Sequence, residues 1–186
     1  PNTTNIGLEN TDITTNERGA IVVNDTCESS VPGVYAVGDV NGGPQFTYIS
    51  LDDFRIVFGA LTGNGQYTLK DRKNIPYTTF LTPPLARVGL TEEDAINKGY
   101  TVKTKEMLVA TMPRAHVNDY LKGAFKIVVN TDNDLILGAT LYSQGAEELI
   151  NLIKMAMDNN IPYTYFKNQI FTHPTMAENL NDLCNF

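Results

Sequence analysis

Two apolar runs separated by four turn-forming residues constrain the fold of this 186-residue chain more than any other feature. The runs are GAFKIVVN, residues 123–130, and LILGATLYS, residues 135–143, and TDND joins them. Asn and Asp tolerate the backbone conformations that reverse a chain, so the runs are predicted to pair as an antiparallel hairpin. Residues 146–159, which follow, have apolar side chains at helical spacing and two acidic residues at the start. A helix that packs on a hairpin is therefore expected.

The preceding segment predicts further strands and a short helix. Residues 75–90 favour extended chain, which a pair of prolines interrupts. In the next segment Thr91 is predicted to be the N-cap of a helix, with Asp94 three residues later and Gly99 as its end. The run MLVATM, residues 107–112, is predicted to be another strand.

The first third of the chain has a different pattern. AIVVN (20–24) and VYAVGD (34–39) are apolar on both faces, which is typical of strands in a sheet covered on two sides. A helix is predicted from about residue 46 to residue 61, with one face formed by Ile49, Ile56, Val57, Ala60 and Leu61. Residues 62–74 lose this periodicity and gain Gly, Asn and charge. The pattern therefore predicts two domains, residues 1–74 and residues 75–186.

Composition and charge limit the class of partner. With 42% hydrophobic and 19% charged residues, a folded chain is expected. The net charge of −7 disfavours nucleic acids and anionic membranes, which basic patches normally bind. The sequence has no apolar run of membrane-spanning length and no signal-peptide pattern, so a cytoplasmic protein is expected. Cys27 and Cys184 lie in no metal-ligand cluster, and we predict two free thiols and no metal site.

The segment IFTHPTMAENLNDL, residues 170–183, contains the most informative histidine. Pro174 suits the first turn of a helix, which predicts that His173 lies at a helix entrance. Glu178 lies within plausible reach of the imidazole, and a carboxylate there would orient the ring for acid–base chemistry. The alternative is a capping histidine with a chance glutamate nearby. His116 has no carboxylate at such a spacing and is assigned no role.

A second candidate site follows residues 34–39, where Gly38 and Asp39 precede a glycine-containing turn and a helix. Ligands of open α/β sheets bind beyond the carboxyl ends of strands. Glycines permit close backbone approach, the Asp39 carboxylate can accept hydrogen bonds from hydroxyl groups, and a helix N-terminus favours an anion. These features suit a ribitol or ribose phosphate, whereas the alternative is that Asp39 only caps the turn or helix.

Four motifs in this order, VYAVGDV, LTPPLARVGLTEEDA, MPRA and FTHPTMAENL, resemble the C-terminal part of the class I pyridine nucleotide–disulfide oxidoreductases. This family includes dihydrolipoamide dehydrogenase, glutathione reductase and mercuric reductase. QFTYISLDDFRIV and DRKN most resemble the bacterial reactive-chlorine-resistance flavoenzymes. The resemblance implies an α+β fold: an antiparallel sheet with helices at residues 75–186, the dimerisation domain, preceded at residues 1–74 by a remnant of an α/β FAD-binding domain.

The resemblance also implies cofactor contacts and a partner. It places Asp39 at the ribitol of FAD, next to Gly38, and it places Gln45, Phe46 and Thr47 along the isoalloxazine ring. NAD(P)H is the implied reductant, and a disulfide or a small molecule is the implied electron acceptor. The implied partner is a second copy of the chain, in a homodimer.

The resemblance further implies that His173 acts across this homodimer as the acid–base group for a redox-active cysteine pair, while Glu178 holds the ring. The cysteine pair and both nucleotide-binding glycine motifs of the family are absent from residues 1–186, so we expect the isolated chain to be inactive and to hold little or no FAD. Gln45-Phe46-Thr47 replaces the Ala-His usual in dihydrolipoamide dehydrogenases, and mercuric reductases usually lack the His-Pro histidine.

Two other classes of function stay open. One is a non-enzymatic dimerisation or interaction module with a structural histidine. The other is a hydrolase that pairs His173 with Ser143 or Ser50, which is disfavoured because neither serine lies in a recognisable nucleophile turn. The sequence selects neither the electron acceptor nor NADH over NADPH.

Overall fold

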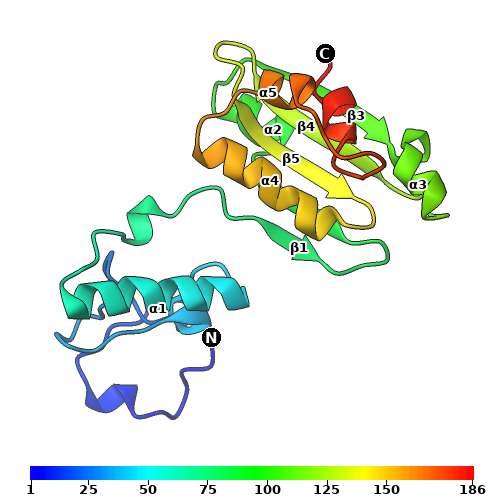
Figure 1. Cartoon of the computed structure of the whole chain (residues 1–186). Helices are drawn as coiled ribbons and strands as arrows, with labels where there is room; N and C mark the ends of the chain where they lie inside the picture. The colour runs from blue at the N-terminus through cyan, green and yellow to red at the C-terminus, as the bar shows by residue number, and fades with distance from the viewer. The chain divides into compact units, whose positions relative to one another are not determined.

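The computed structural model describes all 186 residues, which divide into two compact units, residues 1–73 and residues 74–186 (Figure 1). The division lies next to the domain boundary expected from the sequence. None of the helices in either unit has the length and apolar character that crossing a membrane requires.

The second unit is built on a five-stranded antiparallel sheet. Its strands, in the spatial order β1-β2-β5-β4-β3, are β1 (Tyr77–Thr79), β2 (Leu85–Gly89), β3 (Val102–Leu108), β4 (Ala124–Asn130) and β5 (Ile136–Tyr142). β4 and β5 form the predicted hairpin, in which Ala124 lies opposite Tyr142. Asp134 in the connecting turn has a φ of 60°, the left-handed conformation that Asp tolerates.

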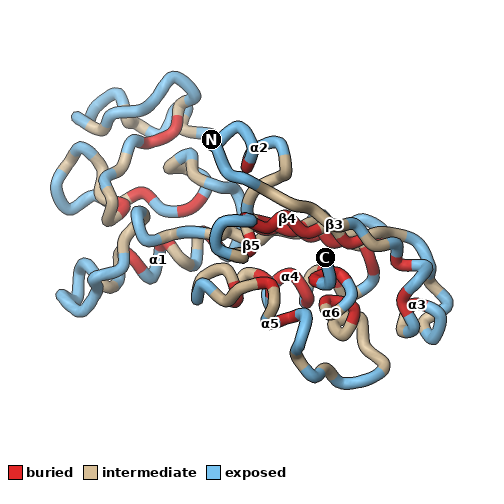
Figure 2. Tube along the Cα trace, turned by 90° about the horizontal axis from the view of Figure 1, so that it is seen from above, coloured by how far each residue is buried: buried red, intermediate tan, exposed pale blue.

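Three of the helices cover one face of this sheet. Figure 2 shows α4 (Ala146–Asp158), α5 (Tyr163–Asn168) and α6 (Asn179–Leu183) on the same side, with α2 (Glu92–Asn97) on the other and α3 (Pro113–Val117) near one end. α2 begins after the predicted N-cap Thr91, whose hydroxyl accepts the Asp94 N–H at 3.0 Å. Mixed strands and helices with an antiparallel sheet confirm the α+β fold class.

The core of the second unit lies between the sheet and these helices. α4 buries four residues of the predicted apolar stripe, whereas the fifth, Met157, is only partly buried. The buried side chains of α4, the central strands and α6 are Leu149, Ile150, Ile153, Ala156, Phe125, Ile127, Leu141, Leu180 and Leu183. In Figure 2 the buried segments follow β4 and the inner side of α4. Burying one such side chain contributes about 1.5–3 kcal/mol. This packing therefore fixes the position of α6, which begins next to Glu178.

The prediction of a strand at residues 107–112 is only partly correct. β3 ends at Leu108, and Val109–Thr111 form the 3-10 turn η4. The Thr111 hydroxyl donates to the Leu108 carbonyl at 2.8 Å, and the Met112 N–H donates to the Val109 carbonyl at 3.0 Å. These local hydrogen bonds replace a strand ladder and turn Val109 and Met112 into the core, where they are 1% and 0% exposed.

The first unit contains one long helix, α1 (Thr47–Thr62), and the 3-10 turns η1 (Leu8–Asn10), η2 (Gly38–Asn41) and η3 (Leu69–Asp71). The predicted helix is thus confirmed, but its predicted buried face is partly wrong. Leu61 is 65% exposed, and the buried side chains are Ile49, Asp53 and Ile56. The buried stripe therefore includes a carboxylate.

The two buried strands predicted at residues 20–24 and 34–39 are not formed. The structure has only isolated bridges there, Thr15 with Ile21 and Glu28 with Tyr35. A strand needs a neighbour for its hydrogen-bond ladder, and residues 1–73 provide none beyond these bridges. Val22 is consequently 47% exposed, although its run is apolar.

Ile153 and Ile96 provide a matched test of this packing. Ile153 on α4 is fully buried, whereas Ile96 on α2 is 55% exposed. Ile153→Ala should lower the free energy of unfolding by about 2–5 kcal/mol, and Ile96→Ala should change it by no more than about 0.5 kcal/mol. Urea denaturation followed by circular dichroism measures both, and equal losses would contradict the assigned core.

Candidate functional site

His173 and Glu178 form an imidazole–carboxylate pair in the second unit. The Nδ1 atom of His173 lies 2.9 Å from Oε2 and 3.2 Å from Oε1 of Glu178. The His173 side chain is 72% exposed, whereas the Glu178 side chain is only 15% exposed. The carboxylate is therefore the fixed partner, and the imidazole projects from it into solvent.

This contact decides which ring nitrogen is free. A carboxylate accepts hydrogen bonds and does not donate them, so Nδ1 carries the hydrogen between the two groups. In the neutral ring Nε2 then keeps its lone pair, and it forms no hydrogen bond within the chain. Nε2 can accept a proton while Glu178 stabilises the resulting cation. The pair is thus suited to general acid–base chemistry.

Short polar side chains fix the backbone between these two residues. The Thr175 hydroxyl donates to the Thr172 carbonyl at 2.7 Å and accepts the Glu178 N–H at 3.2 Å. Asn179, 2% exposed, donates its side-chain amide to the carbonyls of Thr175 and Met176. Such hydrogen bonds from side chain to backbone stabilise turns. The loop that carries His173 is therefore held at several points.

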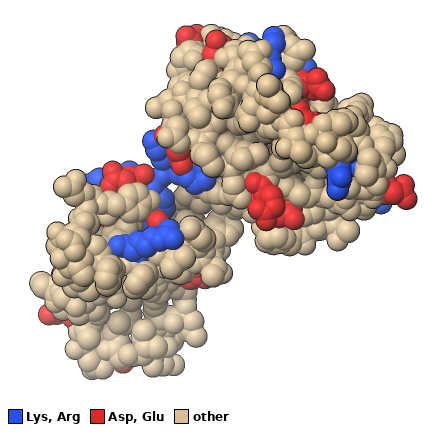
Figure 3. All heavy atoms as spheres, viewed as in Figure 1, with Lys and Arg blue, Asp and Glu red and all other residues tan.

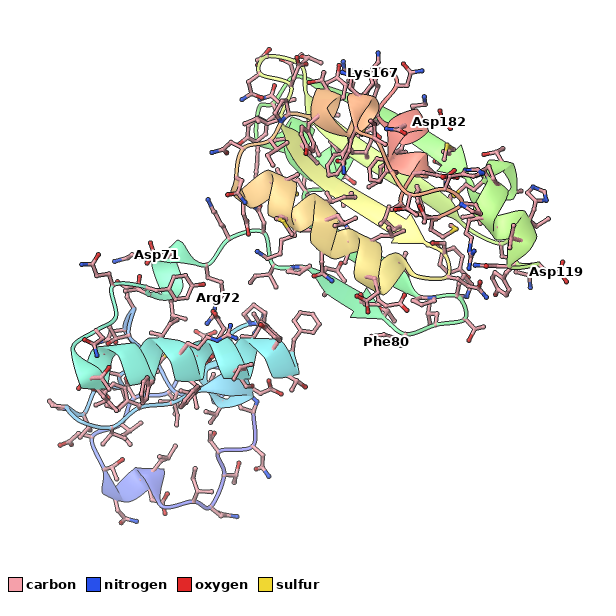
Figure 4. All side chains as sticks on the ribbon, in the orientation of Figure 1. Asp71, Arg72, Phe80, Asp119, Lys167 and Asp182 are labelled. Atoms are coloured by element: carbon pink, nitrogen blue, oxygen red, sulfur yellow. The ribbon has the colours of Figure 1, made fainter.

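The helix α6 supplies a rigid base for the loop. Its C-terminal end is tied to β3, because Lys105 donates through Nζ to the carbonyls of Asp182 at 2.7 Å and Asn185 at 2.6 Å. A cation is favoured at this end of a helix. Figure 4 labels Asp182 on α6. The inner face of the helix and the residue after it are fully buried at Leu180, Leu183 and Cys184.

His173 does not lie at a helix entrance, contrary to the prediction. α6 begins only at Asn179, after Glu178 at its N-cap position, and residues 173–178 form no helix. The reason is local: the Thr175 hydroxyl and the Asn179 amide satisfy backbone groups that a helix would otherwise pair. The structure nevertheless brings the two predicted site residues together.

The other histidine and the only serine of the second unit are engaged elsewhere. His116 hydrogen bonds through Nε2 to the Ala110 carbonyl at 2.8 Å. Ser143 is fully buried, and its hydroxyl donates to the Gln144 carbonyl at 3.1 Å. The second unit therefore contains no pair of a serine nucleophile and a histidine base.

In the first unit, η2 and the start of α1 contain the predicted flavin contacts. Gly38 is buried and has a φ of +73°, and a Cβ built there would lie 2.6 Å from the Ser50 hydroxyl oxygen. This position therefore requires glycine. α1 begins without a side-chain cap. Four side chains around the turn and the helix start are exposed: Asp39, Gln45, Phe46 and Thr47.

A buried carboxylate fixes this turn. Asp53, 0% exposed, accepts the Gly38 N–H at 2.7 Å and the Asn41 side-chain amide at 2.8 Å, both on Oδ2. Its Oδ1 pairs with Arg72, whose Nε also donates to Asp52 at 2.7 Å; Figure 4 shows Arg72 directed at α1. Burial lowers the pKa of Arg72, but the hydrogen bonds and charges of Asp53 and Asp52 outweigh it and raise the pKa overall.

Neither Asp53 nor Arg72 is among the residues predicted from the sequence. A signal for Asp53 was present, since it lies four residues after Ile49 and three before Ile56 on the predicted apolar face. An ionised side chain on a buried face needs a partner. Arg72 carried no such signal: it lies 19 residues from Asp53, in a segment interpreted as a boundary.

Both cysteines are free and buried. Burial is the main cause that raises the pKa of Cys27 to about 11, and the nearby Asp53 carboxylate adds to it. Burial likewise raises the pKa of Cys184 to about 12. No group of three or more His, Cys, Asp or Glu side chains is arranged to hold a metal ion.

Comparison with known proteins decides the family. Residues 75–184 match the dimerisation domain of the pyridine nucleotide-disulphide oxidoreductases, and residues 1–53 match the pyridine nucleotide-disulphide oxidoreductase domain. The chain belongs to the pyridine nucleotide-disulphide oxidoreductase family. The resemblance identified from the four motifs is thus confirmed. Members of this oxidoreductase family are flavoproteins that use FAD and NAD(P)H.

Similar proteins in this oxidoreductase family include bacterial enzymes. The probable pyridine nucleotide-disulfide oxidoreductase RclA of Escherichia coli K12 is 48% identical over 183 residues, which are 98% of this chain and 42% of that protein. Mercuric reductase of Staphylococcus aureus is 34% identical over 180 residues, 97% of this chain and 33% of that protein. The structure of the HOCl-induced flavoprotein disulfide reductase RclA from Escherichia coli matches with a TM-score of 0.95 and 47% identity, over 99% of this chain and 42% of that one. The chain thus spans less than half the length of these relatives.

The burial of the two cysteines gives a testable prediction of their reactivity. A pH of 8 lies well below the pKa values of Cys27 and Cys184, which are about 11 and about 12. The reactive thiolate form is therefore scarce in the folded chain. Iodoacetamide should therefore label Cys27 and Cys184 slowly in buffer and completely in urea, as measured by mass spectrometry. Rapid labelling of either cysteine in the folded chain would contradict the burial described above.

Proposed function

We propose that this chain supplies the dimerisation domain, part of the flavin site and the acid–base histidine of an FAD-dependent NAD(P)H oxidoreductase. The observation that carries the proposal is the contact between Nδ1 of His173 and Glu178, which leaves Nε2 free on an exposed ring. Family membership supports the reaction class, since the related proteins are pyridine nucleotide-disulphide oxidoreductases. The proposed electron acceptor is a disulfide or a small molecule.

The exposed groups of η2 and of the start of α1 fit an FAD. The Asp39 carboxylate can accept hydrogen bonds from the hydroxyl groups of a ribitol chain, next to Gly38. The uncapped helix N-terminus favours a phosphate group, and the exposed Phe46 ring offers a flat apolar surface. Gln45 and Thr47, on either side of Phe46 in the sequence, add polar side chains. When bound, FAD supplies electron transfer from NAD(P)H to the acceptor.

In this proposal His173 moves a proton at Nε2. Two-electron reduction of a disulfide leaves sulfur anions, and the imidazolium of His173 donates its Nε2 proton to one of them. In the reverse direction Nε2 takes the proton from a thiol, and the Glu178 carboxylate stabilises the cation that forms. Cys27 and Cys184 are buried, so the redox-active cysteine pair of this proposal lies in another part of the full-length enzyme.

We further propose that the second unit pairs with a second copy of itself, and that His173 of one copy serves the active site of the other. The match to a dimerisation domain supports this. The unit also exposes large apolar side chains that a partner would cover, including Phe80 at 79% and Ile170 at 94% exposed. Ile170 lies three residues before His173 in the sequence, so a contact there would bring the histidine close to the partner.

The proposed partners are otherwise small molecules, without nucleic acid or membrane. On the face shown in Figure 3 the acidic and basic side chains are scattered over a mostly uncharged surface, whereas polyanions are normally bound by clustered basic residues. A cytoplasmic location is part of the proposal, because NAD(P)H is supplied there.

Substitution of the histidine in the full-length enzyme tests the proposed role. His173→Ala should lower turnover by about 10²-fold or more, the usual contribution of a general acid–base group. Glu178→Gln should lower turnover by roughly tenfold, because the imidazolium loses a charged hydrogen-bond acceptor. Steady-state turnover with NAD(P)H measures both effects. The dependence of turnover on pH should also change in both variants.

The chain provides a matched control in its only other histidine. His116→Ala removes an imidazole that bonds to the Ala110 carbonyl, and turnover should stay unchanged. Unchanged turnover in His173→Ala together with weakened self-association would instead support a structural role of His173, with this chain serving only as a dimerisation module.

The homodimer is tested separately by light scattering of residues 1–186 at several concentrations. The expected result is twice the chain mass of 20.5 kDa, persisting on dilution. A mass of one chain at every concentration would mean that this chain alone does not form the proposed interface.

A further inference from the structure

The turn that carries Asp39 is anchored on both sides of that residue by one carboxylate oxygen. The Gly38 N–H, immediately before Asp39, donates to Oδ2 of Asp53 at 2.7 Å. The side-chain amide of Asn41, two residues after Asp39, donates to the same oxygen at 2.8 Å. The side-chain carbonyl of Asn41 then accepts the Gly43 N–H at 3.0 Å, which extends the anchoring to the end of the turn. The exposed Asp39 side chain takes no part in this network.

A carboxylate can do this only if its charge is compensated. The Asp53 side chain is 0% exposed, and an isolated buried charge is strongly unfavourable. Arg72 pairs with Oδ1, the oxygen that the turn does not use, so the two oxygens have separate tasks. The Arg72 side chain is itself 10% exposed and also bonds to Asp52. Arg72 therefore compensates the charge of Asp53 through Oδ1, and Oδ2 stays available to the turn.

We propose that Asp53, held by Arg72, is the positioning residue that presents Asp39 to the flavin. This inference rests on the proposed flavin contact of Asp39. α1 takes part twice, since Asp53 on its buried face fixes the turn and its uncapped N-terminus lies a few residues beyond that turn. The relative placement of the Asp39 carboxylate and the helix N-terminus is therefore set by one helix.

Asp52 is a neighbouring carboxylate with a different role, and it provides the matched control. It bonds to Arg72 at 2.7 Å and accepts the Tyr67 hydroxyl at 3.3 Å, but it contacts no residue of the turn. Asp52→Asn removes the same charge one position away from Asp53. Any effect that comes only from loss of negative charge near Arg72 appears in both variants, whereas loss of positioning appears only in Asp53→Asn.

The test is FAD binding by the apoprotein of the full-length enzyme, measured by titration of flavin fluorescence. Asp53→Asn leaves one acceptor oxygen where the carboxylate has two, so the side chain cannot serve both the turn and Arg72. The dissociation constant for FAD should rise by about tenfold or more in Asp53→Asn and stay close to that of the unsubstituted protein in Asp52→Asn. Asn41→Ala removes one anchor of the turn without touching the ion pair, and it decides the question if Asp53→Asn does not fold.

Asp39→Ala separates this inference from the proposed function. If Asp53 acts through Asp39, then Asp53→Asn should weaken FAD binding much less in the Asp39→Ala background than in the unsubstituted protein. Two outcomes would overturn the positioning role and leave the proposed function intact. In the first, the effects of Asp53→Asn and Asp39→Ala on the dissociation constant simply multiply. In the second, Asp39→Ala weakens FAD binding, but Asp53→Asn and Asn41→Ala do not. Unchanged FAD affinity in Asp39→Ala would remove the proposed flavin contact itself, and the inference with it.

Discussion

The packing of α6 on the sheet is the constraint on which the contact between His173 and Glu178 depends. Leu180 and Leu183 are fully buried, and Lys105 ties the end of the helix to β3, so the residue just before the helix has a fixed position. That residue is Glu178. An exposed imidazole alone would sample several rotamers, and its contact with a mostly buried carboxylate selects one of them. His173 thus combines an accessible nitrogen with a defined orientation.

Carboxylates hold the candidate functional groups in both units, but by different physical means. Glu178 is mostly buried, but its partner His173 is an exposed imidazole that projects into solvent. Asp53 is fully buried and permanently paired with Arg72. A buried ion pair is seldom more stabilising than apolar residues of the same size. Its presence on the inner face of α1 is therefore better explained by the geometry that it gives to the Gly38–Asn41 turn than by stability.

The features that the sequence predicts correctly are those determined over short distances. The pairing across Thr131–Asp134 follows from turn chemistry, and His173 lies only five residues from Glu178. The strands expected at residues 20–24 and 34–39 do not form, because an apolar run does not reveal whether a neighbouring strand exists to complete its ladder. The bond from Asp53 to a residue 19 positions later could not be predicted for the same reason: no periodicity connects the two. Long-range partners are what the structure adds.

Arg72 also fixes the end of the first unit, because it is the second-last residue of that unit. Residues 62–74 contain no long regular element, and a segment of this kind is normally held only by scattered contacts. The capping box of η3, between Thr68 and Asp71, orders the residues just before Arg72. The ion pair with Asp53 then fastens the end of the segment to α1. A single buried pair therefore both closes the first unit and holds the turn that presents Asp39, which couples the order of the connecting segment to that of the proposed flavin contact.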